Sequence, residues 1–308
     1  MERDRALWMF PGQGAQQAGM GRDLAAAHPA AREVFERANE ALGFDVRALC
    51  FEGPQSDLDS TQNAQPALLA TSIAALAAAR AAGMREGDPI VMGHSLGEFS
   101  ALVAAGTLEF GDALRLVRRR GELMQAADDT GGMAAVLGLD AAAVERAIDG
   151  TGLVIANDNA PGQIVISGPT ATLAAAGDAL RRAGARRVVA LRVSGAFHSP
   201  AMRPVAAQLA RAIARVPMGE LRHPVITNVD AQVHEHAADL PALLERQVWS
   251  PVRWADAVRC AREEGASIFV EFGPGATLTG LVKRIFPDVQ TLNVSSSATL
   301  EEALAVLR

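Results

Sequence analysis

The chain has 308 residues, of which 49% are hydrophobic and 21% are charged, close to the average of globular proteins. This composition excludes a disordered or collagen-like chain and provides for a sizeable core. The 29 Lys and Arg residues against 35 Asp and Glu residues leave a formal charge of −6. That balance argues against general binding to nucleic acid or to an anionic membrane, so we expect neither partner.

The cysteines and the N-terminal residues point to the cytoplasm. Cys50 and Cys260 lie far apart in the sequence, which excludes a disulfide framework and a metal cluster built from cysteine alone. The charged residues 1–5 lead directly into an apolar run, so we expect no secretory signal. The most apolar stretch, residues 67–83, is mostly alanine and falls short of the ~20 strongly apolar residues of a membrane-spanning helix. We therefore expect a soluble, cytoplasmic protein.

Short apolar runs alternate with longer helical patterns, which is typical of an α/β fold with a mostly parallel sheet. The first strand is expected at residues 7–10 and the second at residues 89–92, each followed closely by glycine. Helices are expected over residues 65–82, 96–105 and 110–128, and further strands over residues 224–228, 267–272 and 289–294.

The segment 133–193 has a different order of elements. Its patterns predict a strand (133–139), a helix (140–149), two strands (153–157 and 163–167), a helix (171–183) and a strand (187–193). This β-α-β-β-α-β order is that of a ferredoxin-like domain. It is inserted whole into the larger unit.

Flexible residues flank this insert. Asp129, Thr130 and two glycines precede it, and Ser194-Gly195 follows it, so both places are suited to act as joints. We therefore predict a large α/β domain formed by residues 1–128 and 197–308 and a small domain formed by residues 129–196.

The pentapeptide Gly93-His94-Ser95-Leu96-Gly97 matches the G-x-S-x-G nucleophile elbow. It lies between a predicted strand and a predicted helix, which is the context that the motif requires. Glycines suit this turn because it is too tight for side chains, and the helix start places free N–H groups beside Ser95. The alternative is a glycine-flanked turn in which Ser95 only caps a helix.

A serine hydroxyl is a poor nucleophile until a base takes its proton. Among the six histidines, His198 is the candidate base, because it lies in the loop that leaves the insert and could overhang the large domain. The pair His234 and His236 could suggest a metal site. No third ligand accompanies that pair, so we favour a solvated loop and expect no metal.

The loop 11–16, Pro-Gly-Gln-Gly-Ala-Gln, resembles a phosphate loop only superficially. Gln17 breaks the G-x-G-x-x-G spacing, and no Gly-Lys-Ser/Thr ending follows. Nucleotide binding is therefore not expected. A glycine-rich loop beside the elbow can instead present a backbone N–H to an oxyanion.

Arg120 falls on the apolar stripe of the helix predicted at 110–128, whereas Arg118 and Arg119 point away from it. A buried arginine needs an anionic partner, because an unpaired buried charge is too unfavourable. Its planar fork suits a carboxylate held by two hydrogen bonds. From the pattern alone, that carboxylate belongs either to a substrate or to the protein itself.

Together these motifs resemble the malonyl-CoA:acyl carrier protein transacylase family along essentially the whole chain. The matching blocks lie in the family's order at residues 10–16, 65–67, 93–99, 120–121, 157–162, 195–198 and 271–275. The resemblance implies an α/β-hydrolase-like body with mostly parallel strands and a ferredoxin-like insert, in agreement with the segmentation above.

The resemblance also implies roles for particular residues. It makes Ser95 the nucleophile, His198 the general base and Arg120 the clamp on the malonyl carboxylate. It places the backbone N–H groups of Gln13 and Leu96 in the oxyanion hole. It makes the backbone carbonyl of Ser250 the group that orients the histidine. The residues implied around the pocket are Gln65, His94, Asn157 and Phe197. Many members have asparagine where this chain has Ser250, but a main-chain oxygen does that work.

The implied activity is transfer of malonyl from malonyl-CoA to the phosphopantetheine thiol of acyl carrier protein through a malonyl-serine, supplying fatty-acid synthesis. No metal or redox cofactor is expected, and the protein is expected to be a monomer. The close alternatives are a free-standing acyltransferase of a polyketide synthase and the transacylase subunit of a malonate decarboxylase. The alternatives of other classes are a serine thioesterase or hydrolase and a non-catalytic module that binds acyl carrier protein.

Overall fold

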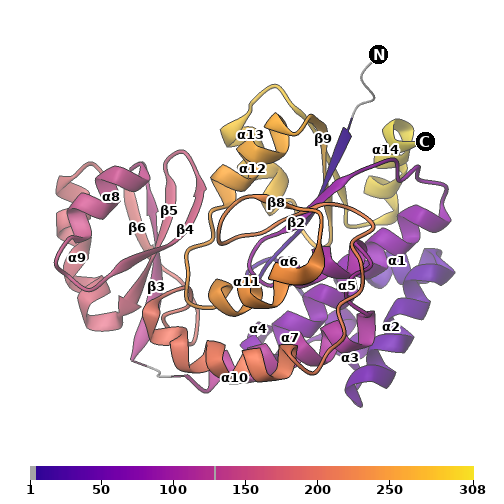
Figure 1. The fold of residues 1–308 in the computed structure, drawn as a ribbon, viewed down its shortest axis with the longest axis horizontal. Coiled ribbons are helices and arrows are strands. Elements are labelled where there is room, and N and C mark those ends of the chain that lie inside the picture. The colour runs from indigo at the N-terminus through magenta and orange to yellow at the C-terminus, as the bar shows by residue number, and fades with distance from the viewer. Residues whose placement is uncertain (1–4, 128–129) are drawn as a thin grey trace.

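The computed structural model describes residues 5–127 and 130–308, and these residues fold around two β-sheets (Figure 1). The larger sheet consists of β1 (Arg5–Phe10), β2 (Ile90–Gly93), β7 (Val225–Ile226), β8 (Val233–His234), β9 (Ala266–Phe272) and β10 (Gln290–Val294). Its strand order is β10-β9-β1-β2-β7-β8, and its pairs are parallel except that of β7 with β8. The predicted α/β class with a mostly parallel sheet is confirmed.

Helices cover both faces of the larger sheet, because successive residues of a strand face opposite sides. Leu7 and Met9 of β1 pack against α12 (Trp254–Glu263) and α13 (Thr277–Ile285). Trp8 and Phe10 belong to a larger apolar cluster on the opposite face. The main helices of that face are α2 (Pro29–Leu42), α5 (Thr61–Ala81), α6 (Gly97–Ala104) and α7 (Phe110–Gln125). A strand buried on both faces reads as a continuous apolar run, which is why β1 and β2 could be predicted.

The remaining helices surround this body. They are α1 (Arg22–Ala27), α3 (Val46–Glu52), α4 (Gln55–Asp59), α10 (Arg203–Ile213), α11 (Leu240–Gln247) and α14 (Ser297–Leu307), with short 3-10 turns at Pro200–Met202 and Ala237–Asp239. No helix among residues 5–127 and 130–308 is both long and apolar enough to cross a membrane.

The smaller sheet lies beside the larger one and has its own apolar core (Figure 1). It consists of β3 (Gly131–Leu137), β4 (Val154–Ala160), β5 (Gln163–Pro169) and β6 (Arg187–Ala190), covered by α8 (Ala141–Ile148) and α9 (Thr170–Arg182). The strand order β4-β5-β3-β6 is antiparallel throughout, so the predicted ferredoxin-like order of elements is confirmed.

Several predicted boundaries shift. Gly131 and Gly132 are not a joint but the first residues of β3, because they continue its ladder with β5. Strand β6 ends at Ala190, before a tight turn in which Val193 N–H donates to the carbonyl of Leu191. The predicted boundary between residues 128 and 129, together with Asp129 of the predicted joint, lies outside the described residues.

Helix α5 begins earlier than predicted, with Pro66 inside it. Proline has no N–H, so Pro66 cannot donate to the carbonyl of Gln62 one turn before it. Arg118 of α7 donates to that carbonyl through Nη1 at 3.1 Å. The hydrogen bond that the proline removes is thus replaced from a neighbouring helix.

The smaller sheet is attached to the larger domain through β4. Val252 N–H donates to the carbonyl of Ala156 at 2.8 Å, and Asp158 N–H donates to the carbonyl of Val252 at 3.0 Å. This short parallel bridge places the middle of β4 next to the segment that follows α11. It thereby brings side chains of the smaller sheet to the carboxyl ends of β1 and β2, where ligands bind in α/β folds.

Candidate active site

The turn between β2 and α6 holds Ser95 in a left-handed conformation, with φ of 50°, which residues bearing side chains rarely adopt. A Cβ atom on Gly93 would lie 1.9 Å from the backbone carbon of Gly97, and one on Gly97 would lie 2.0 Å from the carbonyl oxygen of Phe10. Space therefore requires both glycines. Ser95 does not cap α6, whose N-cap is Leu96 with no side-chain cap bond. The G-x-S-x-G pattern thus forms a nucleophile elbow.

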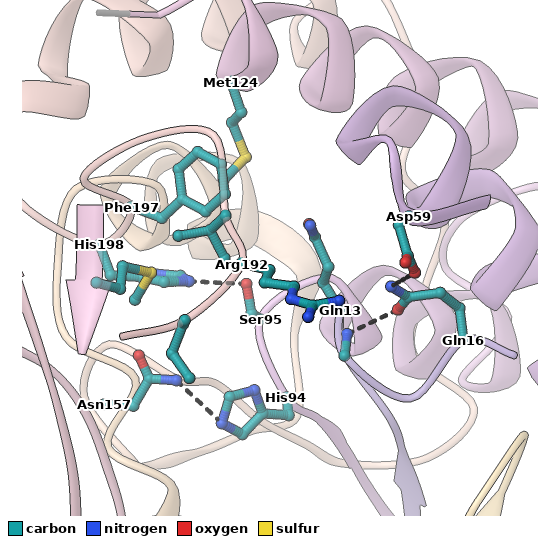
Figure 2. Close-up of a pocket in the computed structure, with 14 residues that line it drawn as sticks. Gln13, Gln16, Asp59, His94, Ser95, Met124, Asn157, Arg192, Phe197 and His198 are labelled. Atoms are coloured by element: carbon teal, nitrogen blue, oxygen red, sulfur yellow. Dashed lines mark hydrogen bonds between the residues drawn. The ribbon is translucent and has the colours of Figure 1, made fainter. Parts of the chain in front are cut away.

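The Ser95 hydroxyl faces His198 (Figure 2). The distance between Ser95 Oγ and His198 Nε2 is 2.8 Å. His198 lies in the loop after β6, is buried and also has a positive φ of 56°. The histidine chosen from the sequence is therefore the one that the fold brings to the serine.

Two backbone carbonyls fix the orientation of the His198 ring. Nδ1 lies 2.9 Å from the carbonyl oxygen of Gln247 and 3.2 Å from that of Ser250. Because carbonyl oxygens only accept hydrogen bonds, Nδ1 must carry the proton, which leaves Nε2 free to accept the proton of Ser95. The Ser250 carbonyl, which the resemblance implied would orient the histidine, does face Nδ1, but the nearer carbonyl is that of Gln247. Gln247 ends α11, where the last carbonyls have no partner within the helix.

His198 is held in its neutral form. Burial, and secondarily the positive charge of Arg120, lower its pKa from 6.5 to about 3, while the hydrogen bond to the Gln247 carbonyl opposes the shift. The imidazole is therefore unprotonated near neutral pH. That is the state a general base requires before reaction.

Arg120 lies in the middle of α7, is 1% exposed and reaches the same hydroxyl. Its Nη2 donates to Ser95 Oγ at 3.0 Å and to Gln247 Oε1 at 3.1 Å. Its Nη1 donates to Gln65 Oε1 at 2.9 Å. All these partners are neutral, and no carboxylate of the described residues is within salt-bridge distance of Arg120. Of the two possibilities left open by the sequence, a salt bridge within the protein is excluded for the described residues.

The Arg120 guanidinium keeps its positive charge despite this burial. Desolvation lowers its pKa from 12.5 to about 10, and the nearby Glu98 opposes the shift. A cation therefore lies buried beside the Ser95 hydroxyl without an anion bonded to it. Such a cation is prepared for an anionic ligand, because binding one would compensate the unfavourable burial.

A cavity of about 370 Å³ opens above Ser95 between the two sheets. Figure 2 shows its lining, which comes from the loop after β1, the elbow, α7, β4 and the segment after β6. Of the predicted pocket residues, His94, Asn157 and Phe197 line it. Gln65 does not, because α5 directs its side chain to Arg120 and Met124, behind the cavity wall.

Side chains of β4 hold the elbow from the side of the smaller sheet. His94 Nε2 lies 2.8 Å from Asn159 Oδ1 and 3.4 Å from Asn157 Nδ2. Asn157 and Asn159 are two residues apart on a strand and therefore share a face. Desolvation lowers the pKa of His94, so this ring is also neutral. The expected place of Asn157 near the pocket is confirmed.

The loop after β1 approaches the elbow closely. A Cβ on Gly12 would lie 2.4 Å from the carbonyl oxygen of His94. The side chain of Gln13 donates to Thr61 Oγ1 at 3.2 Å, and Gly14 N–H donates to Gln16 Oε1 at 2.7 Å. Within the described part of the chain, the backbone N–H groups of Gln13 and Leu96 have no hydrogen-bond acceptor. Two free donors thus lie at the places predicted for an oxyanion hole.

Sequence reasoning missed two polar side chains of the site. Gln247 accepts from Arg120 and donates through Nε2 to the carbonyl of Ser95 at 2.8 Å. Arg192 lines the cavity near its mouth. Gln247 lies more than a hundred residues from both partners and has no motif of its own, so no local signal marks it.

The pair His234 and His236 does not form a metal site. No group of three or more candidate metal-binding side chains occurs among residues 5–127 and 130–308. His234 Nε2 instead lies 3.2 Å from Asp230 Oδ2. His234 lies in β8 rather than in the solvated loop that the sequence predicted, and the exposed His236 follows this strand.

The acyl transferase domain family model matches residues 7–301, and the chain therefore belongs to the acyl transferase family. Within it, the chain is similar to malonyl CoA-acyl carrier protein transacylases. The one from Bacillus subtilis is 42% identical over 99% of this chain and 98% of its own length. The resemblance drawn from the motifs is thus confirmed.

Two further relatives come from polyketide systems. The polyketide biosynthesis protein ThaF of Burkholderia thailandensis is 45% identical over 96% of this chain, which spans 25% of that relative. A crystallised malonyl-transacylase in complex with its type II polyketide synthase acyl carrier protein is 39% identical, with a TM-score of 0.94 over 98% of this chain and 99% of that one.

Proposed function

We propose that the protein transfers malonyl from malonyl-CoA to the phosphopantetheine thiol of acyl carrier protein through a malonyl ester of Ser95. One observation carries this proposal: the hydroxyl that is hydrogen-bonded to a neutral histidine also accepts a hydrogen bond from a buried, unpaired arginine. A nucleophile beside a carboxylate-binding cation matches an acyl group that ends in a carboxylate.

In the first half-reaction, Ser95 Oγ attacks the thioester carbonyl while His198 Nε2 takes its proton. The negative charge of the tetrahedral intermediate falls on the former carbonyl oxygen. The backbone N–H groups of Gln13 and Leu96 are the donors for that oxyanion. The intermediate collapses by breaking the C–S bond, and the imidazolium returns its proton to the coenzyme A thiolate.

The second half-reaction reverses these steps with another thiol. His198 takes the proton of the phosphopantetheine thiol, and the sulfur attacks the malonyl ester. The C–O bond to Ser95 breaks, and the serine oxygen recovers the proton from His198. Side chains and backbone groups supply every proton and every hydrogen bond, so we propose that no metal or redox cofactor takes part.

Arg120 binds the far end of the malonyl group in this scheme. Its two Nη atoms presently contact neutral oxygens, which a carboxylate would outcompete because charged hydrogen bonds are roughly twice as strong as neutral ones. The carboxylate would hold the thioester carbon near Ser95 Oγ. Acetyl groups lack this anchor.

The proposed role is supply of malonyl to fatty-acid synthesis in the cytoplasm. Cys50 and Cys260 are free thiols in the structure, in keeping with a reducing compartment. Ser95, His198 and Arg120 all come from one chain, and we propose a monomer as the working unit. Because two relatives come from polyketide systems, the second candidate function is transfer of malonyl to the acyl carrier protein of a polyketide synthase.

The geometry disfavours hydrolysis as the main outcome. His198 Nδ1 faces two backbone carbonyls rather than a carboxylate, and a hydrolase has no need for an unpaired arginine at the nucleophile. The malonyl-serine ester is therefore expected to persist until a thiol arrives.

Intact-protein mass spectrometry tests the proposal. After malonyl-CoA is added and removed, we expect the mass of one malonyl group on the enzyme. Holo acyl carrier protein should then discharge it onto its own thiol, whereas apo carrier protein, which lacks the thiol, should not. Loss of the adduct to water at the same rate without a carrier would identify a hydrolase. Carriers from fatty-acid and polyketide systems, compared by discharge rate, separate the two candidate pathways.

A further inference from the structure

One buried amide holds both peptide planes that flank His94 and lead into Ser95. The Oδ1 atom of Asn228 accepts the N–H of Ser95 at 2.7 Å, and its Nδ2 donates to the carbonyl of Gly93 at 2.7 Å. Because one backbone partner only donates and the other only accepts, the orientation of this amide is fixed. Asn228 is 1% exposed, so water cannot take over these bonds.

Asn228 is held in turn by a buried carboxyl group. Its backbone N–H donates to Glu98 Oε2 at 2.8 Å. Glu98 lies in the first turn of α6, is 1% exposed, and has its pKa raised by burial to about 7. Burying a carboxyl group is unfavourable unless it is hydrogen-bonded. The hydrogen bond to Glu98 comes from Asn228, the residue whose side chain bonds the elbow.

The backbone of Asn228 also reaches the segment that orients the base. Its carbonyl accepts the N–H of Arg253 at 3.0 Å, three residues after Ser250. The carbonyl of Ser250 is one of the two that face Nδ1 of His198. Asn228 therefore contacts the elbow on one side and the base-orienting segment on the other.

The left-handed conformation of Ser95 has to be stabilised by hydrogen bonds to the adjacent backbone. A residue with a side chain at positive φ is strained and persists only when its surroundings over-determine it. Without the two bonds from Asn228, the Gly93–His94 and His94–Ser95 peptide planes could rotate. Rotation there would move the Cα of Ser95 and with it the hydroxyl, although Gln247 still holds the following plane through the Ser95 carbonyl.

We infer that Asn228, anchored by Glu98, is a positioning residue that holds the backbone leading into Ser95, and thereby its hydroxyl, in the reactive geometry. Asn228 is not among the residues that line the cavity, and among the lining residues described it hydrogen-bonds Ser95, so it acts through the nucleophile rather than on the substrate. The inference rests on the proposed function only in taking Ser95 as the nucleophile.

The first test compares acylation by the wild type and Asn228→Ala. The substitution leaves the Ser95 N–H and the Gly93 carbonyl without their partner. We expect it to lower the maximal rate of malonyl-enzyme formation about 10- to 100-fold. The malonyl-CoA concentration at half-maximal rate should stay within about twofold, because Arg120 and the cavity are untouched. A maximal rate within twofold of the wild type would overturn the inference, as would a loss confined to malonyl-CoA binding.

Variants of Glu98 separate the hydrogen bond from the charge. Glu98→Ala removes the acceptor for Asn228 N–H and should slow acylation. Glu98→Gln keeps an oxygen at that position and should recover most of the lost rate. Because the glutamine variant preserves shape and hydrogen bond, it should fold even if other variants do not. Equal slowing by Glu98→Gln and Glu98→Ala would contradict positioning through this bond.

Glu271→Ala is the matched control. Glu271 is also fully buried, lies in β9 one residue before its end and accepts a backbone N–H, from Thr279 at 2.9 Å, but that bond serves the start of α13. Its removal should lower the melting temperature as much as Glu98→Ala does, without slowing acylation by the folded enzyme. Slowing by Glu271→Ala equal to that by Glu98→Ala would show general destabilisation instead.

A fluorophosphonate reagent keeps this inference separate from the proposed function. It reacts with an activated serine and needs neither a malonyl group nor Arg120. Slower phosphonylation of Asn228→Ala than of the wild type supports positioning, even if the wild type forms no malonyl adduct. Unchanged phosphonylation would contradict positioning even if malonyl transfer itself is confirmed.

Discussion

We propose that Arg120 sets the selectivity of the reaction, because it is a buried cation beside Ser95 that no carboxylate of the described residues neutralises. We expect Arg120→Ala to lower malonyl transfer and to favour acetyl-CoA in relative terms. A charged hydrogen bond is worth ~1.5–3 kcal/mol, so the malonyl-to-acetyl ratio of kcat/KM should fall about ten- to a hundredfold. Arg119→Ala, one residue away on the exposed face with Glu122 as its partner, is the control and should leave the ratio unchanged. An unchanged ratio in Arg120→Ala would leave Arg120 with a structural role only.

Phe197 limits the size of the acyl group in the same account. Its ring lines the cavity immediately before His198 and is 5% exposed. We expect Phe197→Ser to raise methylmalonyl transfer relative to malonyl, because one methyl group in an apolar pocket is worth ~1–3 kcal/mol. Competition between the two thioesters measures the ratio, and acetyl transfer serves as the internal reference. A ratio that does not move would mean that the ring packs between the domains without facing substrate.

The depressed pKa of His198 sets the pH dependence of acylation. Because burial favours the neutral imidazole, the native state binds fewer protons here than the unfolded chain, whose histidine titrates near 6.5. Between 6.5 and about 3, falling pH therefore favours unfolding, while the remaining folded enzyme keeps its base. We expect kcat/KM for acylation to show no inflection at 6.5 and to decline only well below it. An inflection near 6.5 that tracks the His198 imidazole in NMR titration would contradict this.

At the scale of elements, the reactive geometry depends on how closely β1, β2 and α6 approach each other. We expect Gly97→Ala to prevent the native elbow, because its Cβ would overlap the carbonyl oxygen of Phe10 at 2.0 Å. Gly280→Ala in α13 is the matched control, since its Cβ meets no atom within 4 Å. The control should be neutral or stabilise the fold by ~0.5–1 kcal/mol, as alanine does in a helix. Thermal unfolding compares the two, and equal melting temperatures would show that the contact can relax.

Local patterns in the sequence predict some features of these elements but not the residues that join them. The position of Arg120 followed from the 3.6-residue period of α7, and the ferredoxin-like insert followed from its order of elements. Gln247 and Asn228 carry no such signal, because each acts through hydrogen bonds to residues over a hundred positions away. The sequence predicts a strand over residues 224–228, which ends at Asn228, whereas β7 covers only Val225–Ile226; no local pattern indicates that the Asn228 side chain bonds the elbow.

At the scale of the whole molecule, the site exists only where the two sheets meet. The larger sheet supplies the elbow and α7 supplies Arg120, while the loop leaving the smaller sheet supplies His198. The bridge between β4 and Val252 and the contact of His94 with Asn159 fix the two sheets together. A sequence predicts each sheet from local patterns, but the side chains that join them come from distant segments.

Mass spectrometry can identify the residue that carries the malonyl group. After incubation with malonyl-CoA, proteolysis and tandem mass spectrometry of the wild type should place a single malonyl group on Ser95. Ser95→Ala should carry none and should transfer none to holo acyl carrier protein, while its melting temperature stays close to that of the wild type. A malonyl adduct on any other residue of Ser95→Ala, or transfer that survives the substitution, would contradict the account.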